Sequence, residues 1–168
     1  MLNNNLPEHS TVWVYNSARV FSASETETLR HEIRTFTEQW TSHKVGVIAD
    51  GDILHNRFII FMADEAQVAV GGCSIDSSVH FIKKLEKEFN TNFLNRSLVS
   101  FRIKDEVHTL HRSEFEKLLT EETVNDNTIV FNQLVKTKNE LRHKWEIPFG
   151  SSWLKNVSPA HTSFNSIL

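Results

Sequence analysis

The stretch GGCSIDSSVHFIK begins at Gly71 and holds Cys73, the only cysteine among the 168 residues. Gly71 and Gly72 permit a sharp backbone turn, and the apolar residues that follow have helical spacing. A helix N-terminus carries free N–H groups and partial positive charge, which favour a thiolate or a bound anion. Two chemistries therefore fit this turn: nucleophilic or redox use of the thiol, and binding of a phosphate or carboxylate.

Small polar side chains follow the glycine pair. We predict Ser74 as the N-cap, with Asp76, Ser77 and Ser78 in the first helical turn. Asp76 would already supply negative charge there, which competes with a bound anion and disfavours a thiolate. The same residues therefore also fit a purely structural helix cap, and we favour that interpretation over a ligand site and over a reactive thiol.

Catalysis or anion binding here would need help from other side chains. A thiol nucleophile requires a base, most often histidine, and His80 lies two turns along the predicted helix, about 10 Å from Cys73. His55 and His108 could approach only through the tertiary structure. Arg57 is the candidate for additional positive charge. The candidate catalytic residue is Cys73, and the candidate ligand-binding residues are Gly71, Gly72, Ser74, Asp76, Ser77, Ser78, Arg57 and His55.

Four acids form a second constellation near His55. Carboxylates on neighbouring strands can bind Mg²⁺ or Mn²⁺ and support phosphoester hydrolysis. Asp50 and Asp52 share one face of a predicted strand, but Asp64 and Glu65 fall at the end of the next strand, where acids commonly mark a loop. We therefore interpret the four as solvated charges, and predict neither a metal site nor a cofactor.

The segment from 44 to 63 should form the hairpin that positions these acids. Asp50-Gly51 is the stronger turn dipeptide, but a turn there leaves arms of very unequal length. A turn at His55-Asn56 gives two matched strands, 44–54 and 57–63, and we favour it, with Gly51 as a candidate bulge.

Periodicity and capping signals predict the remaining elements. Ser22 and Glu25 have the spacing of a capping box before a helix over 23–42, and Ser113 and Glu116 have the same spacing before a short helix. Thr137 is a candidate cap for a last helix. Further strands are predicted at TVWVY (11–15), SLVSFRIK, VHTLHR and TIVFNQLV, and a second long helix at Ile75 to Phe89.

The first 104 residues run strand, helix, strand, strand, helix, strand. This order predicts an α+β fold with a ferredoxin-like βαββαβ core, an antiparallel sheet and both helices on one face. A further strand pair and C-terminal helices should extend it. The unbroken apolar run from Phe58 to Ala63 predicts a strand covered on both faces. We expect one domain over 1–168, with flexible ends at about 1–10 and 158–168.

Composition limits the classes of partner and compartment. The net charge of −3 and the pI near 6.3 argue against nucleic acid. The longest apolar run, six residues, is far too short to span a membrane, and the start lacks the pattern of a secretory signal. We therefore expect a cytoplasmic protein with no nucleic-acid and no membrane partner.

The stretches VWVYNS, ILHNRF, GGCSIDSSVHFIK and WEIPFGSSW together resemble a family of uncharacterised Bacteroidetes-type proteins that often carry the automatic label of ABC transporter ATPase. The resemblance covers roughly residues 11 to 154 and implies no activity. The label requires a P-loop, G-x-x-x-x-G-K-[ST], which this sequence lacks, so we reject it.

The favoured hypothesis is a non-enzymatic cytoplasmic domain that binds a small anionic ligand or a protein partner. The alternative is a thiol-dependent enzyme or redox protein that uses Cys73, and a metal-assisted hydrolase ranks last. The aromatic stretch WEIPFGSSW fits an arm packed over the sheet, or a partner surface. A homodimer could form through that arm or through a sheet edge.

Overall fold

The computed structural model describes residues 5–42, 45–66 and 68–157. The chain divides into two compact units, residues 1–95 with 133–143 (unit 1) and residues 96–132 with 144–168 (unit 2). Each unit has its own antiparallel sheet and its own apolar core. The fold is therefore α+β, as predicted, while the assignment of the whole chain to one domain stays a prediction.

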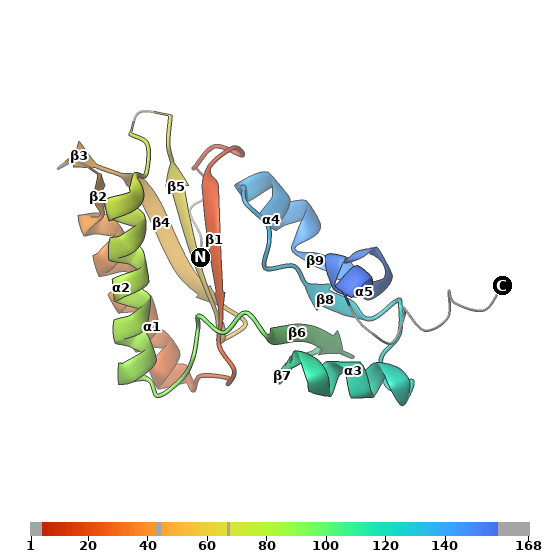
Figure 1. Cartoon of the computed structure of the whole chain (residues 1–168). Helices are drawn as coiled ribbons and strands as arrows, with labels where there is room; N and C mark the ends of the chain where they lie inside the picture. The colour runs from red at the N-terminus through yellow and green to blue at the C-terminus, as the bar shows by residue number, and fades with distance from the viewer. Residues whose placement is uncertain (1–4, 43–44, 67, 158–168) are drawn as a thin grey trace. The chain divides into compact units, whose positions relative to one another are not determined.

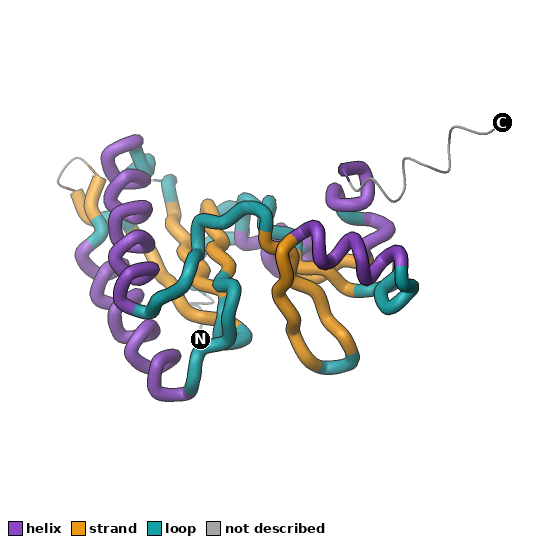
Figure 2. Tube along the Cα trace, turned by 60° about the horizontal axis from the view of Figure 1, so that its bottom comes forward, coloured by secondary structure: helices purple, strands orange, loops and turns teal. Residues whose placement is uncertain are grey.

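Unit 1 is a three-stranded sheet with two long helices on one face (Figure 1). Its strand order is β1-β5-β4, and both pairings are antiparallel. The two helices run beside each other in Figure 2 as well. The elements are β1 (Thr11–Asn16), α1 (Ala23–Gln39), β2 (Thr41–Ser42), β3 (Val45–Gly46), β4 (Ile48–Leu54), β5 (Phe58–Asp64) and α2 (Gly72–Glu88).

The central strand β5 is buried on both of its faces. Every residue from Phe58 to Ala63 is at most 1% exposed, which confirms the prediction from the apolar run. Ile59 and Phe61 pack with Leu29 and Ile33 of α1 and with residues of α2 in one core. Burial of such side chains from both helices supplies most of the energy that holds α1 and α2 on the sheet.

The β4–β5 hairpin has the register that we favoured. His55 and Asn56 both have φ of 50°, and the Arg57 N–H donates to the Leu54 carbonyl at 3.1 Å. The predicted bulge at Gly51 is wrong, because Gly51 pairs directly with Phe61 in an unbroken ladder.

Gly51 is required for a different reason, the close approach of α1. A Cβ at this position would lie 2.7 Å from Ile33 Cγ2 and 2.9 Å from Phe61 Cδ1. Both side chains belong to the fully buried core and cannot move aside cheaply. Glycine therefore lets the helix pack directly against the strand.

The predicted ferredoxin-like core is not confirmed, because its last strand lies in another sheet. Residues 98–103, predicted as that strand, pair with residues 106–111 and 129–131 in the sheet of unit 2. Residues 136–138 take the place beside β1 instead: Thr11 and Thr137 form an antiparallel bridge, and the Val12 N–H donates to the Lys136 carbonyl at 2.9 Å. Sequence order alone could not reveal this exchange of edge partners.

The N-terminal segment is held by α4 (Lys138–Lys144). The Lys138 Nζ donates to the Leu6 carbonyl and lies 3.8 Å from Glu8, and Arg142 pairs with Glu8 at 2.6 Å. Leu6 and Ser10 are buried. Of the ends predicted to be flexible, residues 1–4 and 158–168 lie outside the described residues.

Unit 2 is a four-stranded antiparallel sheet in the order β7-β6-β8-β9. The β6–β7 hairpin forms as predicted, and it extends beyond the rest of its sheet in Figure 2. Phe101, Phe115, Val130 and Phe149 centre its core. The elements are β6 (Leu98–Ile103), β7 (Glu106–His111), α3 (Arg112–Thr120), β8 (Ile129–Phe131), β9 (Glu146–Pro148), η1 (Phe149–Ser151) and α5 (Trp153–Val157).

Two predicted helix caps have different outcomes. The Ser22–Glu25 capping box is confirmed, with both reciprocal hydrogen bonds present. The Ser113–Glu116 box is wrong: α3 begins two residues earlier, His111 is its N-cap, and Glu114 completes the box. Glu116 instead pairs with Arg112 one turn back, at 3.0 Å.

Candidate functional site

The N-cap of α2 is not the residue that was predicted from the sequence. Gly71 is the N-cap, with φ −72° and ψ 172°, so no glycine here needs a left-handed conformation. Ser74 is the third helical residue and is buried, so its predicted role as the N-cap is wrong. Gly71 has no side chain to accept a hydrogen bond from the first turn, and its own N–H donates to the Ser42 hydroxyl at 3.4 Å. The turn is ordinary extended backbone leading into a helix.

This end of α2 is anchored to the segment that follows α1. The Ser74 hydroxyl donates to the Thr41 carbonyl at 3.0 Å, and the Trp40 indole N–H donates to the Ser74 carbonyl at 3.0 Å. The Ser42 hydroxyl donates to the Ala69 carbonyl at 2.8 Å. The bond from Trp40 is buried and the other two are partly buried. Together they fix the helix start, because breaking one would leave a polar group shielded from water without a partner. Trp40 and Ser42 have no motif around them that would have predicted this role.

The first two residues of α2 are exposed and their amides are unused. Among the described residues the N–H groups of Gly72 and Cys73 have no acceptor, and both residues are exposed. A Cβ added at Gly72 would meet no atom within 4 Å. Two free N–H groups at a helix N-terminus, with room above them, are the elements of a small anion site.

The other polar side chains predicted for this turn belong to α2 or bond to its backbone. Asp76 is the fifth helical residue and lies outside the first turn, so it does not compete for the free amides. The Ser77 hydroxyl donates to the Ser74 carbonyl and the Ser78 hydroxyl to the Ile75 carbonyl, both at 2.7 Å. The His80 Nδ1 lies 2.8 Å from the Asp76 carbonyl oxygen.

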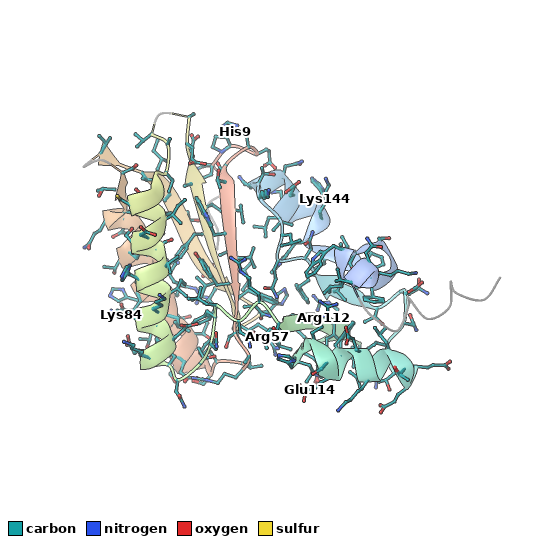
Figure 3. The ribbon with its side chains drawn as sticks, viewed as in Figure 1. His9, Arg57, Lys84, Arg112, Glu114 and Lys144 are labelled. Atoms are coloured by element: carbon teal, nitrogen blue, oxygen red, sulfur yellow. The ribbon has the colours of Figure 1, made fainter. Side chains whose placement is uncertain are left out.

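Arg57 and His55 do not join this site. They belong to the turn before β5, whereas α2 follows the other end of that strand. A strand of this length separates the two ends by about 20 Å. Figure 3 labels Arg57 at one end of the sheet and His9, 3.4 Å from Asp64, at the other. Arg57 is 5% exposed, and burial lowers the pKa of its guanidinium.

The acidic residues that were candidates for a metal site make separate structural contacts instead. Asp52 is buried and pairs with Arg30 of α1 at 2.8 Å. Asp64 accepts the Ala66 N–H at 3.0 Å. Glu65 accepts the Thr11 hydroxyl, and the Val70 N–H at 2.8 Å. Within 5–42, 45–66 and 68–157, no group of three or more histidine, cysteine, aspartate or glutamate side chains could hold a metal ion.

The aromatic stretch near the C-terminus contributes mainly to the core of unit 2. Trp145 packs edge-on against Phe131 at 5.1 Å, and Phe149 packs against Phe115 at 5.5 Å. Only Trp153, which is 38% exposed, remains as a candidate contact for a partner.

A shallow, open depression lies on the surface of α2, lined by His80, Lys83, Lys84, Lys87 and Glu88. The candidate site residues proposed from the sequence do not include it. In the sequence, only the four-residue spacing of Lys83 and Lys87 marks this surface, and that spacing is equally typical of any solvated helix face.

Comparisons with known proteins identify no relative. No family model, no curated protein and no solved structure matches the chain. Across the described residues, no helix is both long enough and apolar enough to cross a membrane.

Proposed function

We propose that the protein is a non-enzymatic binding domain that takes a small anion, such as a phosphate or carboxylate group, at the N-terminus of α2. The observation that carries this proposal is the pair of exposed, acceptor-free amides at Gly72 and Cys73. The helix dipole adds partial positive charge at the same point. Arg57 and His55, the other candidates from the sequence, are not part of this site.

The anchoring of the helix start supports the same proposal. The contacts of Ser74 with Thr41 and Trp40 hold the first turn in place. A ligand would therefore meet donors that are already oriented, and binding would cost little ordering of the backbone. Among the described residues, no charged side chain bonds to these two amides, so we expect weak affinity for a simple anion and tighter binding for a ligand with further contacts.

Removing one amide without disturbing the helix tests the proposal. Proline is favoured at the first helical position, and the extended conformation of Gly71 suits the residue before a proline. Gly72→Pro therefore removes one donor and keeps the fold. Gly72→Ala, whose Cβ enters open space, keeps the donor and is the matched control.

The measurement is the thermal shift with inorganic phosphate. At phosphate tenfold above its Kd, the natural protein and Gly72→Ala should gain about 1.4 kcal/mol, while Gly72→Pro should gain much less. Amide NMR shifts at Gly72 and Cys73 in the natural protein would locate the anion. Equal thermal shifts in all three proteins would contradict the proposal.

The alternative function is thiol chemistry at Cys73. The observation that favours it is the exposure of this thiol at the second position of a helix, where a substrate can reach it. Alkylation of the folded protein across pH, with the unfolded chain as reference, measures the reactivity of the thiol. A thiol in the folded protein that reacts no faster at low pH than in the unfolded chain would remove this alternative.

A further inference from the structure

The strand β7 forms one edge of the sheet of unit 2. The direction of its backbone groups follows from one hydrogen bond, in which the Arg112 N–H donates to the Ser97 carbonyl at 2.8 Å. Bonded and non-bonded pairs alternate along an antiparallel ladder, so Glu106 and His108 bond to β6, while Val107 points its N–H and C=O outward. Among the described residues, these two backbone groups of Val107 have no hydrogen-bond partner.

The edges of the three-stranded sheet in unit 1 are partly covered. Beside β1, the Val12 N–H donates to the Lys136 carbonyl at 2.9 Å. Along β4, the Ile53 N–H donates to the Asp52 carboxylate at 2.8 Å, and Gly51 is buried. In unit 2, the opposite edge strand β9 has only three residues and ends in a proline. The outward backbone of an edge strand is a template for pairing with another chain, and β7 presents it over six residues that are exposed or half-buried.

The side chains next to Val107 are complementary to themselves under a two-fold axis. An antiparallel pair centred on Val107 joins the two valines by two backbone hydrogen bonds and places Glu106 of each copy opposite His108 of the other. Those flanking positions are a non-hydrogen-bonded pair, with Cα atoms about 4.5 Å apart and side chains in close reach. An imidazole N–H can donate to the facing carboxylate, and opposite charges at such positions stabilise pairing.

The same operation applied to β4 produces repulsion. Gly51 lies two residues before Ile53, so its backbone also points outward from the sheet. Pairing two copies about Gly51 would place Asp50 of each copy opposite Asp52 of the other. Like charges directly opposite each other destabilise a strand pair. The charge pattern therefore favours self-pairing at β7 and disfavours it at β4.

Both charged side chains of β7 are accessible. The Glu106 side chain is 84% exposed and the His108 side chain 41%. Within one chain the His108 Nε2 and the Glu106 Oε2 are 3.8 Å apart, too far for a hydrogen bond. The His108 ring stacks on Phe101, with 5.8 Å between the centroids, which fixes its orientation. The hairpin also extends beyond the rest of its sheet in Figure 2.

We propose that the protein forms a symmetric dimer in which β7 pairs antiparallel, about Val107, with β7 of a second copy. The occupant is a second copy because the order Glu106, Val107, His108 meets its own complement in this pairing. Two backbone hydrogen bonds and two Glu106–His108 contacts make a small interface, so the dimer is weak and forms at high protein concentration. These residues belong to unit 2, whereas the anion site at the start of α2 belongs to unit 1.

The test is sedimentation equilibrium of the full chain over protein concentrations that reach the millimolar range. The natural protein should show a monomer–dimer equilibrium. Val107→Pro removes the outward N–H, leaves the β6–β7 ladder intact, and should be monomeric throughout. Glu106→Lys places a cation opposite His108 and should weaken the dimer about tenfold. Melting temperatures of the variants check that each one folds.

The exchanged variant Glu106→Lys/His108→Glu restores opposite charges and should recover most of the lost affinity. Glu121→Lys makes the same change of charge at an exposed position after α3 and is the matched control, which should dimerise as the natural protein does. A natural protein that stays monomeric at every concentration would overturn the proposal. Equal weakening in Glu106→Lys and in the control would do so too, as would dimerisation that Val107→Pro leaves unchanged.

Discussion

The two long helices of unit 1 begin in contrasting ways. Each spans 17 residues and packs on the same sheet face. At the start of α1, the Ser22 hydroxyl accepts the Glu25 N–H, the Glu25 carboxylate accepts the Ser22 N–H, and Arg19 pairs with Glu25 at 2.7 Å. At the start of α2, the N-cap Gly71 has no side chain to bond the first turn, and its N–H donates to the Ser42 hydroxyl at 3.4 Å.

The difference shows where each helix start gains its stability. For α1 the bonds are local, and Arg19 extends them by donating to the Phe89 carbonyl at the end of α2 at 2.7 Å. For α2 the bonds are tertiary and involve Ser74, the third helical residue, leaving the first two amides unused. An anion could complete the cap of α2 as Glu25 completes that of α1.

The largest expected effect comes from disturbing the packing of α1 at Gly51. Gly51→Ala places a Cβ within 3 Å of Ile33 and Phe61, and overpacking a fully buried core typically costs 1–3 kcal/mol. We expect a loss of about 2 kcal/mol in the free energy of unfolding, measured by urea denaturation. Gly72→Ala, at the start of the other helix, should lose none. Similar stability of both variants would contradict the close packing of α1 on β4.

An intermediate effect is expected from acid titration of the α1 cap. The hydrogen bond from Arg19, then that from the Ser22 N–H, lowers the pKa of Glu25 from 4.5 to about 2. A lowered pKa in the folded state means that ionised Glu25 stabilises the fold above about pH 4.5, and that this contribution is lost as the pH falls toward 2.

Melting temperatures measured between pH 6 and 2 test this dependence. Glu25→Gln should melt a few degrees lower than the natural protein at pH 6, and the two should converge as the pH approaches 2. Glu27→Gln, at an exposed position two residues on, is the matched control and should retain most of the dependence. A constant difference between Glu25→Gln and the natural protein across this range would mean that Glu25 does not act through its charge.

The smallest effect is expected from giving α2 the cap that α1 has. Gly71 already has the extended conformation of Ser22, an N-cap with φ −64° and ψ 166°. Gly71→Asp should therefore stabilise the protein by a few tenths of a kcal/mol. Its carboxylate would also occupy the free amides and abolish the phosphate shift.

Gly71→Asn separates the two contributions, since it can cap the helix without a charge. We expect its stability to lie close to that of Gly71→Asp, measured by calorimetry. If Gly71→Asp binds phosphate as well as the natural protein does, the amides of Gly72 and Cys73 are not the anion site.

Local patterns predicted most single elements well. The Ser22–Glu25 box, the burial of Phe58 to Ala63 and the turn at His55-Asn56 all depend on residues close in sequence, and all are confirmed. The predicted N-caps at Ser74 and Ser113 were wrong by two or three residues. Serine suits a cap and an early helical position, and only tertiary contacts, such as that of Ser74 with Thr41, decide between them.

The candidate site could be predicted only in part. The start of α2 at the glycine pair follows from a short stretch of sequence, but the exposure of Cys73 does not, because the sequence fits a packed cysteine equally well. The distance between Arg57 and the start of α2 could not be predicted from the sequence. It depends on the fact that the two segments join opposite ends of β5. The structural contacts of Asp52 and Glu65 could not be predicted either. Their partners, Arg30 for Asp52 and Thr11 for Glu65, are distant in sequence and are brought close only by the fold.

The sequence by itself determined the order of the longer helices and strands, the favoured hairpin register and the acidic net charge, because these depend on local periodicity and composition. Only the tertiary structure decided that residues 98–103 pair with β7 and β8, and that residues 136–138 pair beside β1. It also decided that α2 begins without a side-chain cap. The physical reason is that backbone hydrogen-bonding groups are alike in every residue, so their partners are chosen by which side chains pack together.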